Sequence, residues 1–261
     1  MVYSQTRVSL TLTQSAINDW QQGERTAFEI SNSLDYKYKY KIDTLNLAIS
    51  LRYALGIQYL KNENINVAFV IPTDNDIFGE LLLSYPLGWK LDPFISTSFR
   101  TQLTESFIIF KDTKKRTANL WDPVTSTQSF GFSFSTISSS LNFNFRPGIT
   151  LKQIRSNMHY QMTDDLKTKD IIEKYRAESG IEIKSELMIK MNDLSTYNTS
   201  LEIFSTFDKI SAFSGRWLNS LQIKIWSFFG IIINLDIIYD EKQMKRVQYK
   251  QTTRIGILAN L

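Results

Sequence analysis

Ser156 and His159 are the residues whose types come closest to supporting nucleophilic catalysis. His159 is the single histidine in 261 residues, and the chain contains no cysteine. A barrel hydrolase or acyltransferase needs a histidine base beside its serine nucleophile, but strand residues three positions apart point to opposite faces. No acidic residue is spaced to orient the histidine. We therefore predict no catalytic residues and no cofactor, and interpret His159 as a rim residue.

The segment Thr73 to Asp76 offers a second kind of chemistry, because Asp74, Asn75 and Asp76 bring together oxygen atoms of the type that calcium prefers. The remaining ligands of a calcium site are missing at the expected spacings. The sequence therefore predicts no metal site, and Gly-rich phosphate loops are also absent.

A short basic run occupies the longest polar connection that we expect in the chain. Its cations are Lys111, Lys114, Lys115 and Arg116. Such a run can bind the phosphates of lipopolysaccharide or an acidic partner, or it can be a solvated loop. The partners expected are outer-membrane lipid, lipopolysaccharide and envelope proteins. Nucleic acid is not expected, since the net charge is only +4.

Charged residues of both signs also recur along one face of alternating segments. They could line a solute path, or they could pair across it and close it, because partly buried charges seek partners. Mixed signs argue against a strongly ion-selective pore. The row consists of Glu29, Asp35, Lys37, Arg52, Glu80, Arg100, Glu182, Lys184, Glu186, Glu202, Lys224, Asp236 and Arg254.

The segments that carry these charges alternate with period two over unusually long stretches. From Leu45 to Tyr59 every odd position is aliphatic or tyrosine, and the even positions are small or polar. About fifteen such residues span roughly 50 Å, beyond the strand length of ordinary soluble proteins. We expect about twelve strands, at 7–17, 25–40, 45–60, 76–86, 92–104, 128–145, 149–160, 178–191, 195–207, 217–227, 231–241 and 248–261.

The expected connections alternate between short and long. Short turns are predicted at 41–44, 87–91, 146–148, 192–194 and 228–230, and long polar connections at 18–24, 61–75, 105–127, 161–177, 208–216 and 242–247. This alternation, with both termini at the short-turn side, is typical of an outer-membrane barrel. Tyrosines and other aromatics near the turns fit an interfacial girdle.

Two barrels fit the pattern, and they differ in which face meets water. A membrane barrel has its apolar face toward lipid, whereas a soluble lipocalin-like barrel has it inside. Twelve strands enclose more volume than side chains alone readily fill, and an apolar interior of that width would be an oversized dry cavity. The sequence therefore favours an all-β, transmembrane antiparallel barrel with short periplasmic turns and longer extracellular loops, formed by one domain over residues 1–261.

Several segments resemble, in the same order, an uncharacterised outer-membrane β-barrel family of Bacteroidota, a domain of unknown function. The segments are Asp19–Glu24, with Trp20 and Gly23, then Thr73–Asp76, Phe99–Leu103, Ile237–Asp240 and the closing stretch Arg254–Leu261. The resemblance implies the barrel fold and the outer membrane of a Gram-negative cell. It implies no catalytic residues. The closing strand ends in Leu261, whereas such barrels commonly end in Phe.

Residues 1–6 lack the charged and apolar regions of a signal peptide, and we interpret them as the remnant of a cleaved segment with an added methionine. The function expected is a narrow, porin-like conduit for small solutes. The alternatives are a non-conducting structural or accessory subunit of an outer-membrane assembly, a lipid-modifying barrel enzyme and, last, a soluble ligand-binding barrel. We expect no enzymatic activity.

Overall fold

The computed structural model consists of β-strands and their connections. It describes residues 2–18, 28–62, 67–88, 90–110, 113–158, 163–164, 171–241 and 244–260. Among these residues there is no helix with the length and apolarity needed to cross a membrane.

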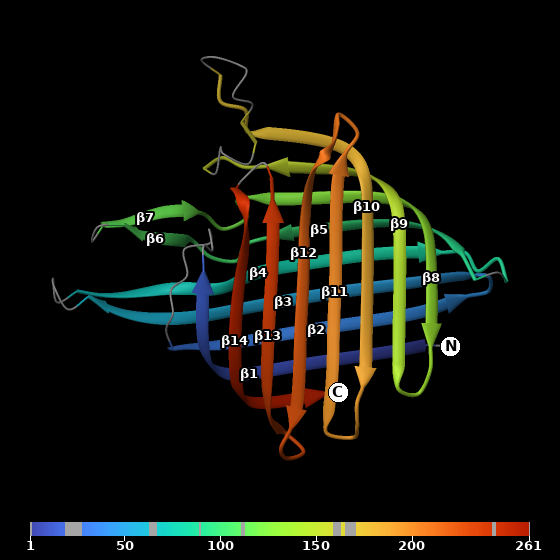
Figure 1. The fold of residues 1–261 in the computed structure, drawn as a ribbon, viewed down its shortest axis with the longest axis horizontal. Helices are drawn as coiled ribbons and strands as arrows, with labels where there is room; N and C mark the ends of the chain where they lie inside the picture. The colour runs from blue at the N-terminus through green and yellow to red at the C-terminus, as the bar shows by residue number, and fades with distance from the viewer. Residues whose placement is uncertain are drawn as a thin grey trace.

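Twelve antiparallel strands close into one barrel, in the order β1-β14-β13-β12-β11-β10-β9-β8-β5-β4-β3-β2 (Figure 1). Two further strands, β6 and β7, form a separate hairpin that extends from the barrel. The closed twelve-stranded, all-β barrel predicted from the alternation is confirmed. The bounds are β1 (Val2–Asn18), β2 (Phe28–Ile42), β3 (Leu45–Asn62), β4 (Val67–Ser84), β5 (Asp92–Thr101), β6 (Ser106–Phe110), β7 (Thr113–Ala118), β8 (Val124–Ile137), β9 (Leu141–Arg155), β10 (Tyr175–Lys190), β11 (Ser195–Thr206), β12 (Lys209–Lys224), β13 (Phe229–Asp240) and β14 (Met244–Asn260).

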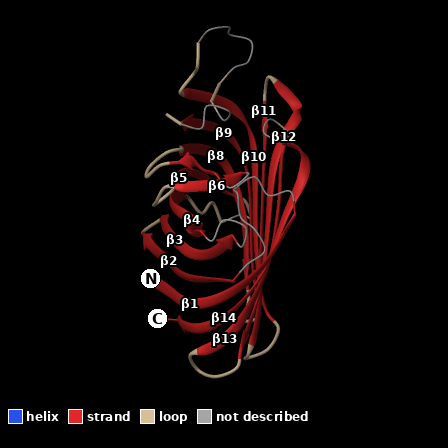
Figure 2. Ribbon diagram, turned by 90° about the vertical axis from the view of Figure 1, so that its left-hand side faces the viewer, coloured by secondary structure: helices blue, strands red, loops and turns tan. Residues whose placement is uncertain are grey.

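The two ends of the barrel differ. At one end, the turn end, lie the connections β2–β3, β4–β5, β8–β9, β10–β11 and β12–β13, together with the start of β1 and the close of β14. The other end, the loop end, carries the remaining connections and the β6–β7 hairpin. In Figure 1 strands β10 to β14 cross strands β1 to β5 at a steep angle, and Figure 2 shows them as two curved layers facing each other.

The ladder registers sort every strand into an apolar and a polar face. On β1, Leu10 and Leu12 point outward and are 52% and 63% exposed, while Thr11 and Thr13, which alternate with them, are buried. Thr13 pairs with Glu29 of β2, which pairs with Gln58 of β3, so one register carries the polar face around the wall. Gln58 is only 1% exposed. Apolar side chains therefore cover the outside, and the lumen is lined mainly by polar side chains, with a few buried apolar ones such as Phe94, Phe204 and Leu258.

The predicted turn at 146–148 is wrong. The chain turns instead at Ser138–Ser140, between β8 and β9, and Pro147 lies within β9. Two residue pairs are missing from an otherwise unchanged register there, because proline has no N–H to donate. Gly131 faces Gly148 across this point, where a Cβ on Gly131 would lie 2.1 Å from the Pro147 carbonyl oxygen. The proline and glycine mark a close approach of two strands rather than a turn.

Three of the predicted long connections are also wrong. The stretch 61–75 belongs mostly to β3 and β4, which leaves only residues 63–66 between them. Pro72 and the polar residues after it lie in β4, at a bulge where Asp74 has a φ of 47°. Asx side chains tolerate that left-handed conformation. Likewise β12 begins at Lys209 and β14 at Met244, so the connections at 208–216 and 242–247 shrink to a few residues, and the strict alternation of loop lengths fails there.

Candidate functional site

The lumen is the candidate site, because the ladder registers place every charged residue named in the sequence row on the inner face. For example, Asp35 lies opposite Arg52 in the β2–β3 ladder, and Lys184 lies opposite Glu202 in the β10–β11 ladder. These inward-facing charged residues are distributed along the whole length of the barrel. They are Glu29, Asp35, Lys37, Arg52, Glu80, Arg100, Glu182, Lys184, Glu186, Glu202, Lys224, Asp236 and Arg254.

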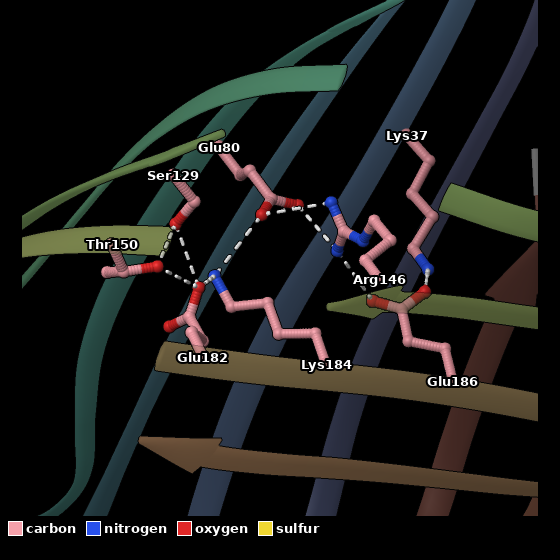
Figure 3. A network of polar contacts seen from close by, with 8 residues as sticks. All are labelled: Lys37, Glu80, Ser129, Arg146, Thr150, Glu182, Lys184 and Glu186. Carbon is pink, nitrogen blue, oxygen red and sulfur yellow. Dashed lines mark hydrogen bonds and ion pairs between the residues drawn. The ribbon is translucent and has the colours of Figure 1, made fainter. Parts of the chain in front are cut away.

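A network that we call the lumen lattice crosses the interior from one wall to the other (Figure 3). It consists of Lys37, Glu80, Ser129, Arg146, Thr150, Glu182, Lys184 and Glu186. At its centre both terminal nitrogens of Arg146 donate to the carboxylate of Glu80, each at 3.3 Å. Arg146 stands on β9 and Glu80 on β4, strands that are not neighbours in the barrel. The bidentate pair therefore ties together wall segments that share no backbone hydrogen bonds.

The lattice continues on both sides of that pair. Lys184 Nζ lies 3.5 Å from Glu80 and 3.3 Å from Glu182, and Ser129 Oγ donates to Glu182 at 2.9 Å. Thr150 then donates to Ser129 at 2.9 Å. Each carboxylate of this part thus receives a cation and, for Glu182, a hydroxyl as well.

Burial shows how tightly the lattice fills the lumen. The side chains of Arg146 and Glu80 are 5% and 9% exposed, and that of Glu182 is 6% exposed. At the turn end the network reaches the mouth, where Lys37 and Glu186 are 49% and 47% exposed and lie 3.8 Å apart. A water-filled pore would wet its lining side chains throughout, whereas these are wetted only at the mouth.

A second bridge spans the lumen nearer the loop end. Asp74 at the β4 bulge contacts both Lys250 and Arg254 of β14, and its oxygen lies 3.1 Å from Lys250 Nζ. Strands β1, β2 and β3 lie between β14 and β4 in the barrel. The bridge therefore spans the inner surface of these three strands, and Thr13, Glu29 and Gln58 on that surface are almost completely buried.

A third group, which we call the arginine group, consists of Arg52, Arg100 and Arg216. Arg52 and Arg100 share one carboxylate, Asp76, each at 3.3 Å. The ring of Phe78 lies under both guanidinium groups, with centroid distances of 5.2 and 5.1 Å, a cation–π arrangement. The side chains of Arg52, Arg100 and Asp76 are 27–33% exposed, so water reaches this part of the lumen more than it reaches the pair of Arg146 and Glu80.

Several lumen residues were not found from the sequence. Arg146 was assigned to a turn and Arg216 to a loop, because the strands that carry them were drawn too short. Lys250 lies within a predicted strand on the same face as Arg254, so counting by two would have found it. Ser129 and Thr150 carried no signal, since uncharged hydroxyls are common on either face of a strand.

The other candidate chemistry is dispersed. Asp74 and Asp76 contact different cations, and Asn75 binds the backbone of Leu103 and Thr104 at 2.9 and 3.1 Å. The described residues hold no group of three His, Cys, Asp or Glu side chains able to bind a metal ion. The prediction for His159 lies outside the described residues, whereas Ser156 is fully buried.

The basic run lies in and next to the β6–β7 hairpin. Lys111 is outside the described residues, and Lys114 and Lys115 belong to β7. Arg116 donates to Glu105 at 2.7 Å on the exposed rim. Asn75 also donates to Ser106 at the base of β6, so the hairpin is fixed to the barrel bulge.

Comparison with known proteins adds one family match. A model described as "Protein of unknown function (DUF3078)" matches residues 12–107. This region spans the last part of β1, all of β2 to β5 and the start of β6, and it includes three of the five segments on which the resemblance was based. No curated protein matches the sequence.

Solved structures with similar architecture include proteins of outer membranes. The NanC porin shares 8% identity with a TM-score of 0.47, covering 96% of this chain and 98% of the porin. Outer membrane phospholipase A from Escherichia coli shares 11% identity with a TM-score of 0.44, covering 99% and 98%. The CymD monoaromatic hydrocarbon channel shares 9% identity with a TM-score of 0.41, covering 99% and 88%. A porin, an enzyme and a channel are thus all among the neighbours, so the neighbours do not agree on an activity.

Proposed function

We propose that this protein is an outer-membrane β-barrel that does not conduct small solutes in this conformation, and that it serves as a structural or accessory subunit of an envelope assembly. The observation that carries the proposal is the combination of an apolar outer face with a lumen closed by the buried pair of Glu80 and Arg146. The conduit expected from the sequence remains the second candidate, supported by the partial exposure of Arg52 and Arg100 inside the lumen.

The membrane placement is argued from the outer face. Ile30 on β2 is 58% exposed, and Phe130 and Ile149, which are partners in the β8–β9 ladder elsewhere on the wall, are 60% and 59% exposed. Monomeric soluble proteins rarely expose a contiguous apolar surface of such extent. A closed barrel also satisfies its backbone hydrogen bonds internally, as the hydrocarbon core requires. Lipid is the solvent that suits this surface.

The first test is fractionation followed by gel migration with and without boiling. We expect the native protein in the outer-membrane fraction and a folded band that shifts on heating. Leu10→Arg, in the middle of β1, should cost about 2–4 kcal/mol of folding free energy in lipid. Leu194→Arg, in the β10–β11 turn, is the control and should cost far less. Aqueous solubility without detergent, or equal effects of the two variants, would overturn the membrane placement.

The second test is solute flux. Proteoliposomes that contain the purified barrel should swell in small sugars no faster than empty vesicles do, because the buried pair of Arg146 and Glu80 crosses the middle of the lumen. Swelling that scales with barrel content would instead establish the conduit.

An accessory role requires a surface for partners, and the rim supplies one. The β6–β7 hairpin extends from the loop end, and Asn75 and Glu105 anchor it at its base. The basic residues of this segment suit lipopolysaccharide phosphates or an acidic envelope protein. Mild detergent extraction should co-purify the partner with the intact barrel and lose it when residues 107–117 are replaced by a short Gly-Ser turn.

A further inference from the structure

We propose that the arginine group forms a binding site for an oxyanion, such as the carboxylate or phosphate group of a small solute, inside the loop-end half of the lumen. The proposal stands on lumen geometry and does not depend on whether the barrel conducts.

The first argument is the imbalance of charges. Arg52 and Arg100 both rely on the single carboxylate of Asp76, at 3.3 Å each, and the Arg100 contact is an ion pair through Nε without hydrogen-bond geometry. Arg216, on the opposite wall, forms no ion pair or hydrogen bond with the described residues, and its buried Nε is unsatisfied. Among the described residues, the three guanidinium groups thus form ion pairs with only one carboxylate, that of Asp76, and most of their N–H donors remain available.

The second argument is that the three arginines face one another across the lumen. Arg52 and Arg100 come from β3 and β5 on one wall, and Arg216 comes from β12 on the other. Arg100 and Arg216 are close enough to repel each other, the strongest charge–charge effect on Arg100. A negatively charged group between them would replace this repulsion with two attractive contacts, the bidentate chemistry for which arginine is suited.

The carboxylates around Arg216 compete with such a ligand for this arginine, but none of those that the structure describes forms an ion pair with it. Glu202 pairs with Arg216 in the β11–β12 ladder, and Asp236 and Asp74 also act on it electrostatically. Asp74 is engaged by Lys250 and Arg254. Glu202 is the direct neighbour, so it sets how strongly an added anion binds.

The third argument is access. On β4, Asp76 comes before Glu80 and so lies nearer the loop end, and Arg100 is next to the last residue of β5 at that same end. The lattice around Glu80 and Arg146 thus forms a floor beneath the arginine group. Phe78 fixes the planes of Arg52 and Arg100 by stacking below both, which lowers the cost of ordering them on binding. The arginine group therefore lies on the loop-end side of the pair of Glu80 and Arg146, where Arg52 and Arg100 are more exposed than that pair.

The test is calorimetric titration of the detergent-solubilised full-length barrel with inorganic phosphate, at fixed ionic strength in chloride. We expect saturable one-to-one binding. Arg216→Gln should weaken it at least tenfold, whereas Arg116→Gln, which removes an arginine from the exposed rim, should leave it unchanged. Glu202→Gln should tighten binding, because it removes the carboxylate that competes for Arg216.

Heat-dependent gel migration confirms that each variant is folded before it is titrated. Equal affinity in the wild-type protein and Arg216→Gln would overturn the proposal. An equal loss in Arg116→Gln would also overturn it, since binding would then be at the surface. Weaker binding in Glu202→Gln would also overturn it, because the anion would then not compete with Glu202 for Arg216. These outcomes do not depend on whether the proteoliposomes swell, so the phosphate titration and the solute-flux test can fail separately.

Discussion

The lumen lattice and the arginine group both contain arginines and carboxylates on the same inner face, but they differ in burial and in the number of carboxylates per arginine. In the lattice, Arg146 is 5% exposed and bound by two terminal nitrogens to Glu80. In the arginine group, Arg52 is 33% exposed and shares its carboxylate with Arg100. The difference teaches that the balance of partners, rather than the presence of charge, decides whether a polar lumen closes or stays available to a ligand.

The two regions should differ most when one arginine is removed from each. Arg146→Ala leaves Glu80 buried, with Lys184 as its remaining partner, and should cost about 3–5 kcal/mol of folding free energy. Arg52→Ala leaves Asp76 paired with Arg100 in a more hydrated space and should cost about 0–1 kcal/mol. Urea unfolding of the two variants in the same lipid vesicles measures both. Similar losses would mean that the lattice is no more tightly closed than the arginine group.

Substitution of a glycine beside each region should show the same contrast, with a smaller loss of folding free energy. A Cβ at Gly131, beside the lattice, would lie 2.1 Å from the Pro147 oxygen, whereas one at Gly215, beside Arg216, would meet its nearest atom at 3.9 Å. Gly131→Ala should therefore cost about 1–3 kcal/mol by overpacking, and Gly215→Ala should be nearly neutral. Thermal unfolding monitored by gel migration checks the pair. A tolerated Gly131→Ala would argue that these two strands lie further apart.

The smallest effect is expected at the wetted edge of the lattice. Lys37 and Glu186 lie 3.8 Å apart and are about half exposed, so Lys37→Ala should cost about 0–1 kcal/mol, and less at high salt. Unfolding at 0.05 and 0.5 M NaCl measures this screening. A large loss that does not depend on salt would move the closed part of the lumen to the mouth itself.

The sequence was sufficient for the wall of the barrel but not for what the lumen side chains do. Alternation over residues such as Leu45 to Tyr59 predicts long strands and assigns inner and outer faces, because a strand has a period of two. It cannot show that Arg146 reaches Glu80 across the barrel, since such contacts depend on strand order, stagger and side-chain length together. The contact joins residues 66 positions apart.

Prolines and bulges account for the remaining errors. Pro147 and Pro72 fall in segments that were predicted as connections, yet both lie within strands. In β9 the ladder passes the proline by losing two pairs, and in β4 the strand continues through the Asp74 bulge. Because of these features Arg146 was assigned to a turn and β4 was predicted to begin too late. The predicted row of lumen charges therefore lacked Arg146, the partner of Glu80.

The most direct test of the closed lumen is single-channel recording in planar bilayers with two proteins: the wild-type barrel and the double variant Glu80→Ala with Arg146→Ala. Removing both partners avoids a lone buried charge and leaves a gap across the lumen. We predict no discrete conductance steps for the wild-type barrel and stable steps for the double variant. Steps of the same size from both proteins would contradict the account, because the lattice would then not be what closes the barrel.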